Sequence, residues 1–187
     1  MNELERYSEL FAHLHTNKRF GYAAPHKAVL LLSVIDLVET GYINSPHISF
    51  SDELIKTFEH NWNRYLGTLS YFKPDASKPF FHMQHEPFWC LREREEGFMA
   101  MAAEPSLTIR NADKKELPTK GYSKKALRKA FCWAEIDQAL FLLMQNKEAR
   151  AHLRVVLIST FLLNHPQKSN KIAFPSCLLP LLCFLAS

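Results

Sequence analysis

The stretch from Val29 to Val38 constrains the fold of this chain more than any other part of the sequence. Apolar residues point in nearly every direction around the axis of a helix built on it. A helix that is apolar all round has to be covered on all sides by other elements. Pro25 suits the start of such a helix, and Gly41 suits its end. The sequence therefore predicts one central core helix, and a chain of 187 residues is long enough to bury it.

Helical spacing of apolar residues predicts the elements around this core helix. Leu4, Tyr7 and Phe11 share one face of a first helix. Ser51 or Asp52 suits the N-cap of another, because these side chains accept bonds from free backbone N–H groups. Helices are predicted over residues 3–16, 52–65, 135–145 and 147–163, with a short basic helix after Ser123.

Two short apolar runs on either side of Pro87 predict β-structure. Lys78–Met83 and Phe88–Leu91 have the composition of two strands joined by a turn. Pro79 would then start a strand, where a sheet tolerates proline. His47–Phe50 reads either as a short strand or as the approach to a helix, and Leu107–Arg110 reads as another short strand.

These patterns together predict the fold class and the domain organisation. We expect an α+β fold, a mostly helical single domain with a small antiparallel β-hairpin or sheet. The domain spans residues 1–163, and residues 164–187 form an apolar C-terminal tail that packs on the body or on another chain. This tail is too short to cross a bilayer and the N-terminus has no apolar signal region, so we expect a cytoplasmic protein.

Positive charge is concentrated in one segment of a chain whose net charge is only +4. Seven lysines and arginines lie between Lys114 and Lys129, and Glu116 is the one acidic residue among them. Such a segment favours a polyanionic partner. The alternative is a solvated loop and helix face with no partner.

Most enzymatic sites leave no pattern in this sequence. The cysteines at 90, 132, 177 and 183 form neither a disulfide framework nor the paired spacing of a zinc site. No GxSxG motif occurs, and five glycines provide no phosphate-binding loop. His82 and His85 would point to opposite faces of a strand, so we expect no shared metal there. The sequence thus predicts no catalytic residue, no metal and no cofactor.

Five sequence blocks resemble a known bacterial family. Gly21–Leu32 and Asp36–Gly41 resemble its opening, in which a proline, a histidine and a basic residue precede an apolar helix. The further blocks, in the same order and spacing, are Phe58–Trp62, Lys78–Leu91 and Ile136–Phe161. The family is the DNA sulfur-binding domain of phosphorothioate-dependent restriction endonucleases. The resemblance covers about residues 4–163.

This resemblance implies a domain that binds modified DNA without cutting it. In the family, a pocket holds the sulfur that replaces one phosphate oxygen. One part of its wall is a proline, together with the aromatic residue before it and a small residue three positions after it. The other part is the alkyl stem of a basic residue that follows a histidine. His26, Lys27 and Pro79 match this pattern, whereas Lys78 stands in place of the aromatic residue and His82 in place of the small one.

We therefore expect His26, Lys27, Lys78, Pro79 and His82 to meet in one DNA- or sulfur-binding surface pocket. Further contacts to phosphates are expected from the basic helix, through Lys124, Lys125, Arg128 and Lys129. The aromatic residues Phe80, Phe81, Phe88 and Trp89 are expected in the core rather than at the DNA.

The sequence thus predicts a DNA-binding module of a bacterial restriction or defence system, specific for phosphorothioate or otherwise backbone-modified duplex DNA. In many relatives a nuclease domain follows, whereas this chain stops at Ser187, so we expect either that a nuclease partner does the cutting or that the chain is a truncated product. Two alternatives stay open. One is a small metal-dependent nuclease that uses Asp75, Asp113 and Lys115. The other is an interaction module that forms homo-oligomers through the C-terminal tail and binds no DNA.

Overall fold

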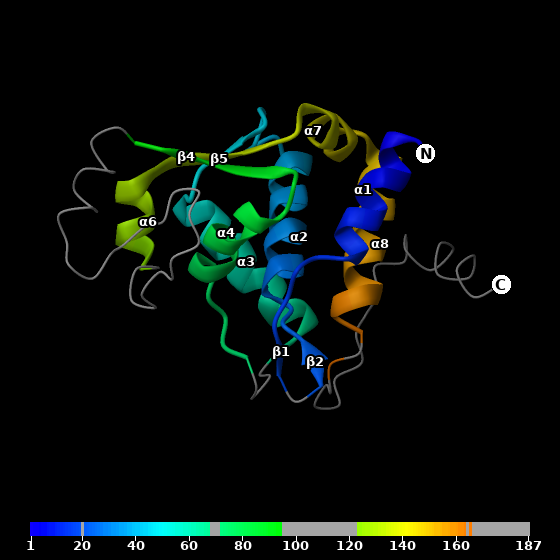
Figure 1. Ribbon diagram of the computed structural model, residues 1–187, viewed down its shortest axis with the longest axis horizontal. Helices are drawn as coiled ribbons and strands as arrows, with labels where there is room; N and C mark the ends of the chain where they lie inside the picture. Colours follow the sequence, from blue (N-terminus) through cyan, green and yellow to red (C-terminus); the bar gives the residue numbers. More distant parts are fainter. Residues whose placement is uncertain (20, 68–71, 95–122, 164, 166–187) are drawn as a thin grey trace.

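A computed structural model describes residues 1–19, 21–67, 72–94, 123–163 and 165 (Figure 1). The described helices are α1 (Glu3–Ala12), α2 (His26–Glu39), α3 (Asp52–Tyr65), α4 (Ser77–His82), α6 (Lys124–Ala130), α7 (Gln138–Gln145) and α8 (Lys147–Phe161), and the 3-10 turn η1 (Met83–His85) follows α4. The described strands are β1 (Lys18–Arg19), β2 (Tyr22–Ala23), β3 (His47–Ile48), β4 (Trp89–Glu93) and β5 (Phe131–Ile136). The protein is a mostly helical α+β fold, which confirms the predicted class.

Helix α2 is the centre of the molecule, as its sequence predicts. Every residue from Lys27 to Ile35 is buried, and α3, α4, α7 and α8 all pack against this helix. Figure 1 shows α2 with α1 and α8 on one side and α3 and α4 on the other. Pro25 is the N-cap of α2. Gly41 follows the end of this helix, and its φ of 75° is unfavourable for a residue with a side chain.

The predicted helix starts at Ser51 and Ser123 are confirmed. The Ser51 side chain accepts a bond from the backbone N–H of Leu54 at 3.2 Å, and the Ser123 side chain accepts one from Ala126 at 3.1 Å. Each serine satisfies a first-turn N–H group that has no partner within its helix. These two caps fix where α3 and α6 begin.

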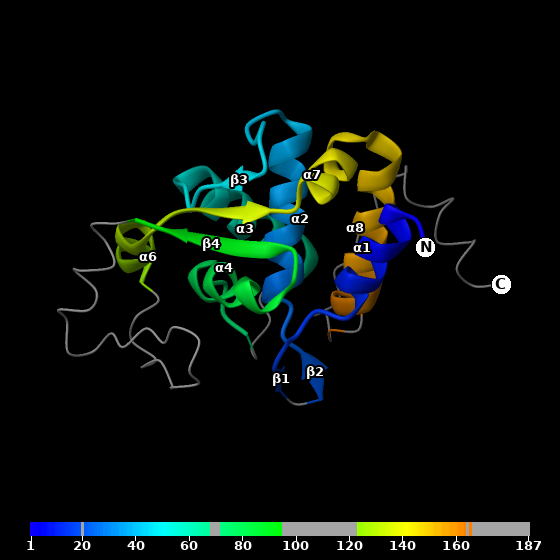
Figure 2. The same ribbon diagram turned by 45° about the horizontal axis from the view of Figure 1, so that its top comes forward.

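The predicted hairpin of Lys78–Met83 with Phe88–Leu91 is wrong in its first strand. Residues 77–82 form helix α4, and β4 pairs instead with β5 in an antiparallel sheet of order β3-β5-β4 (Figure 2). Pro79 lies in the first turn of α4, where its missing N–H group would have had no helical acceptor. The aromatic residues of this region are buried as expected: Phe80, Phe81, Phe88 and Trp89.

Other boundaries differ from the prediction by a turn or less. Helix α1 ends at Ala12 rather than Thr16, although Leu14 beyond it stays buried. The segment between α1 and α2 contains the small hairpin β1–β2, which projects from the body in both views (Figures 1 and 2). Glu135 and Ile136 end β5 instead of starting a helix, and His47–Ile48 is a strand.

Some expectations fall on residues that the structure leaves undescribed. The short strand at Leu107–Arg110 and nearly all of the apolar tail after residue 163 lie outside the described ranges. Among the described helices, none has the length and apolar character that a membrane span requires.

Candidate anion-binding pocket

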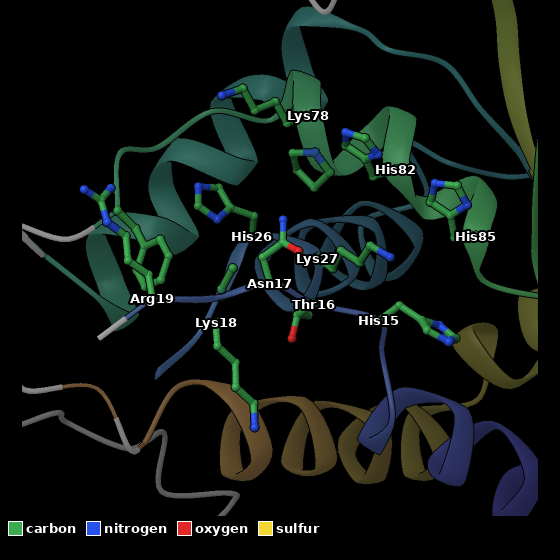
Figure 3. Close-up of a pocket in the computed structure, with 13 residues that line it drawn as sticks. His15, Thr16, Asn17, Lys18, Arg19, His26, Lys27, Lys78, His82 and His85 are labelled. Carbon is green, nitrogen blue, oxygen red and sulfur yellow. The ribbon is translucent and has the colours of Figure 1, made fainter. Parts of the chain in front are cut away.

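The five residues expected in one pocket all line a single cavity of about 1100 Å³ (Figure 3). Figure 3 shows His26 and Lys27 at the start of α2, with Lys78 and His82 on one side and the segment from His15 to Arg19 on the other. The convergence requires α4 to pack against α2, which it does. The described residues that line it are His15, Thr16, Asn17, Lys18, Arg19, Ala24, His26, Lys27, Phe72, Lys78, Pro79, His82 and His85.

The charged residues among the described part of this lining are all basic. Lys18, Arg19, Lys27 and Lys78 contribute four cationic groups, and four histidines can add more on protonation. None of the described lining residues is aspartate or glutamate. Lys18 and Lys78 are exposed, and neither forms an ion pair with a described residue. A concave surface of this composition attracts anions and concentrates their field.

The start of α2 strengthens this preference for anions. No side chain caps this helix at Pro25, and its first turn contains no acidic residue. The unpaired N–H groups of a helix start and the helix dipole both favour negative charge nearby. Because His26 and Lys27 belong to this first turn and also line the pocket, the positive end of α2 lies at the pocket wall.

Lys27 has a partner that the sequence did not indicate. Its Nζ lies 2.5 Å from Oε1 of Glu86, and both side chains are buried, at 8% and 2% exposure. Glu86 also accepts a bond from the backbone N–H of His15 at 3.0 Å, and its other oxygen lies 3.2 Å from His15 Nδ1. The charge of Lys27 is therefore already balanced within the fold. Its expected role in binding a phosphate remains a prediction, and its role in the fold is now evident.

His26 is held in place from three directions. Its Nε2–H group donates to the carbonyl of Lys73 at 2.9 Å, and its ring packs on Trp62 and Phe72 with centroid distances of 4.8 and 5.7 Å. Burial lowers the pKa of His26 below the usual 6.5. The neutral ring, with Nε2 protonated, presents Nδ1 as its remaining polar atom.

His82 and His85 lie side by side, which corrects the expectation from a strand. On α4 and η1 their rings stack at a centroid distance of 5.9 Å. Burial, followed by the nearby His85, Lys27 and Lys78, lowers the pKa of His82. No group of three or more potential metal ligands occurs among the described residues.

Acidic pH should have opposite effects on stability and on anion binding. Because the pKa values of His26 and His82 are lowered in the folded protein, the unfolded chain binds more protons below about pH 6.5. We therefore expect the free energy of unfolding to fall as the pH drops from 7.5 to 5.5. Over the same interval the affinity for phosphate anions should rise, because protonated histidines attract phosphate. Urea titrations and binding titrations across this range test both trends, and an affinity that falls with the stability would contradict them.

The four basic residues expected to assist are outside this pocket lining. Helix α6 packs on β5 and α4, and it lies apart from the β1–β2 hairpin in both views (Figures 1 and 2). Lys124 lies 3.7 Å from Glu59, and Arg128 pairs with Asp52 at 2.5 Å, so acidic residues of α3 already balance these two charges. Lys125 and Lys129 are exposed and form no ion pair with described residues. Phosphate contacts by the four residues remain a prediction.

The residues of the nuclease alternative are not assembled in the described part of the chain. Asp75 accepts a bond from the backbone N–H of Ser77 at 2.9 Å and so helps to start α4. Asp113 and Lys115 lie outside the described residues. The two described cysteines, Cys90 and Cys132, are free thiols.

Comparison with known proteins adds no family assignment to this geometry. None of the protein-family models matches the chain, and no curated protein matches it significantly.

Proposed function

We propose that this chain is a DNA-binding module of a bacterial restriction or defence system. Its pocket takes a backbone phosphate or phosphorothioate of duplex DNA, and a separate nuclease partner does the cutting. The observation that carries the proposal is the composition of the pocket lining, in which cations and histidines surround the positive end of α2 without an acidic residue among the described ones. Phosphates of DNA bind to lysine and arginine side chains and to helix starts of this kind.

The apolar part of the lining supports selection for a modified backbone. Pro79 is buried, and with Phe72 and Ala24 it contributes apolar surface to the described lining of the pocket. Sulfur is larger and less strongly hydrated than oxygen, so contact with such a surface favours a phosphorothioate over a phosphate. The cations around it compensate the charge that both groups share.

The proposal is tested with two duplexes of one sequence, one with ordinary phosphates and one with a phosphorothioate, each titrated at two salt concentrations. We expect both duplexes to bind, more weakly at the higher salt, because binding releases counterions from the DNA. We also expect the phosphorothioate duplex to bind more tightly at each salt concentration. Absence of binding to both duplexes at low salt would refute the proposed function. Equal affinity for both would refute only the selectivity.

Replacing Pro79 by alanine separates the apolar contact from the charge. Helix α4 tolerates the substitution, because alanine is a good helix former and position 79 lies in the first turn. We expect affinity for the phosphorothioate duplex to fall by about 1–2 kcal/mol, the scale of a few buried apolar groups. Affinity for the ordinary duplex should hardly change, because the cations remain. An equal loss for both duplexes would show that Pro79 only supports the shape of the pocket.

A further inference from the structure

Glu86 lies directly behind the wall of the pocket, although it is not among the described residues that line it. Its side chain is 2% exposed and has three polar contacts. One carboxylate oxygen lies 2.5 Å from Nζ of Lys27 and accepts a bond from the backbone N–H of His15 at 3.0 Å. The other oxygen lies 3.2 Å from Nδ1 of His15. Because Lys27 and His15 both belong to the lining, a fixed negative charge stands behind two residues of the pocket wall.

The contact with Glu86 changes what Lys27 offers to a ligand. Figure 3 shows the Lys27 side chain extended along the pocket wall, with its amino group on the side of His15. This ammonium group is paired with Glu86 inside the fold, and the whole side chain is only 8% exposed. A lysine whose charge is paired in this way offers mainly its four-carbon stem. The start of α2 therefore adds apolar surface to the lining, to which the buried Pro79 also belongs.

An unpaired ammonium group at Lys27 would have the opposite preference. It would donate charge-assisted hydrogen bonds, and oxygen accepts these better than the larger and less polar sulfur. The binding of an ordinary phosphate would then become stronger, and the difference between the two backbones would shrink. Against the stem of a paired lysine, an oxygen loses its water without gaining a partner. Sulfur is less strongly hydrated and loses less, so the paired state favours the phosphorothioate.

We infer that Glu86 is a positioning residue that sets the selectivity of the pocket: by neutralising Lys27 it keeps this part of the wall apolar and favours a phosphorothioate over a phosphate. The inference rests on the proposed function, because it takes the pocket as the place where the DNA backbone binds. Glu86 does not contact the DNA and acts through Lys27. The exposed Lys18 and Lys78 attract both kinds of backbone and do not discriminate between them.

The test replaces Glu86 by glutamine, which keeps an oxygen for Lys27 and for the backbone N–H of His15 but removes the negative charge. Titrations with matched ordinary and phosphorothioate duplexes at pH 7.5 should show about tenfold tighter binding of the ordinary duplex, the scale of one added charged hydrogen bond. The slope of log affinity against log salt concentration should steepen by about one unit. The phosphorothioate duplex should gain less, so the preference for it should shrink.

Two further variants separate selectivity from net charge and from folding. Glu9→Gln removes one exposed negative charge from α1, outside the described pocket lining, and should leave the ratio of the two affinities as it is. Lys27→Met/Glu86→Leu replaces the ion pair by apolar side chains and should keep the preference for the phosphorothioate. Urea unfolding identifies which variants are folded. Because the double variant contains neither charge of the pair, it tests the inference even where Glu86→Gln does not fold.

Several results would overturn the inference. A folded Glu86→Gln variant with an unchanged ratio of affinities and an unchanged salt slope would show that Glu86 serves stability alone. A salt slope shallower by about one unit in Lys27→Met/Glu86→Leu would show that the ammonium group of Lys27 already contacts a phosphate. Equal binding of both duplexes by the unmutated protein would leave no selectivity to explain, although DNA binding would stand. Absence of binding to either duplex would remove the proposed function as well.

Discussion

Replacing Glu86 by alanine is expected to lower the free energy of unfolding by about 3–5 kcal/mol, the cost of breaking a buried ion pair from one side. The substitution leaves the ammonium group of Lys27 buried without a partner and removes the acceptor of the His15 N–H group. The Lys27 side chain is buried in the fold, so water cannot fully replace the carboxylate. Urea unfolding followed by circular dichroism measures the effect.

Two controls test whether the loss of stability comes from the buried ion pair. Glu9→Ala removes a carboxylate whose partner His13 is exposed, and it should change the stability by less than about 1 kcal/mol. The double variant Lys27→Met/Glu86→Leu removes both charges and should recover most of the loss, because an apolar pair can replace a buried ion pair. If Glu86→Ala were as stable as the unmutated protein, Lys27 would have to reach solvent, and the assignment of its charge to the fold would be wrong.

Removing the two exposed lysines of the pocket should cause the largest loss of DNA binding. In the double variant Lys18→Gln/Lys78→Gln we expect affinity for an ordinary duplex to fall on the order of tenfold to a hundredfold at low salt. The slope of log affinity against log salt concentration should become shallower by about two units, one for each lost phosphate contact. Stability should hardly change, because neither lysine is buried or ion-paired with a described residue.

Other lysine pairs serve as references for this loss. Lys56→Gln/Lys147→Gln removes the same charge outside the pocket lining and should leave the salt slope within error of the unmutated value. The double variant Lys125→Gln/Lys129→Gln tests the contribution of α6. It should weaken binding to the ordinary and the phosphorothioate duplex alike. If the pocket pair and the reference pair reduced binding equally, net charge rather than the pocket would explain the affinity.

The parts of the fold that the sequence predicts well depend on local signals. The apolar stretch around Leu30 allows only a buried helix, and Ser51 and Ser123 cap helices through bonds to residues three positions away. The run Lys78–Met83 is the opposite case, because a run of six residues, four of them apolar, fits a strand or a helix equally well. The strand that does pair with β4 is β5, which lies about forty residues further along the chain.

The candidate pocket was also predictable only in part, because some of its contacts join residues that are distant in the sequence. The resemblance to a family placed His26, Lys27 and Pro79 together, and the structure brings them into one lining. Glu86 was missed because its contacts are distant in sequence, at 59 residues to Lys27 and 71 residues to His15. No local pattern reveals which cation a carboxylate will meet in the folded protein. His15 and Thr16 were likewise predicted as the end of a helix, and the segment from His15 to Arg19 forms one wall of the pocket.

The most direct test of the pocket as the DNA site is the NMR spectrum of the histidine side chains during a titration with duplex DNA. The chain has nine histidines, of which His15, His26, His82 and His85 line the pocket. We predict that the ring signals of His26 and His82 shift on DNA binding and move toward the protonated form, while those of His13 and His152 stay in place. Shifts confined to histidines outside the pocket, with His26 and His82 unchanged at saturating DNA, would contradict the assignment of DNA binding to this pocket.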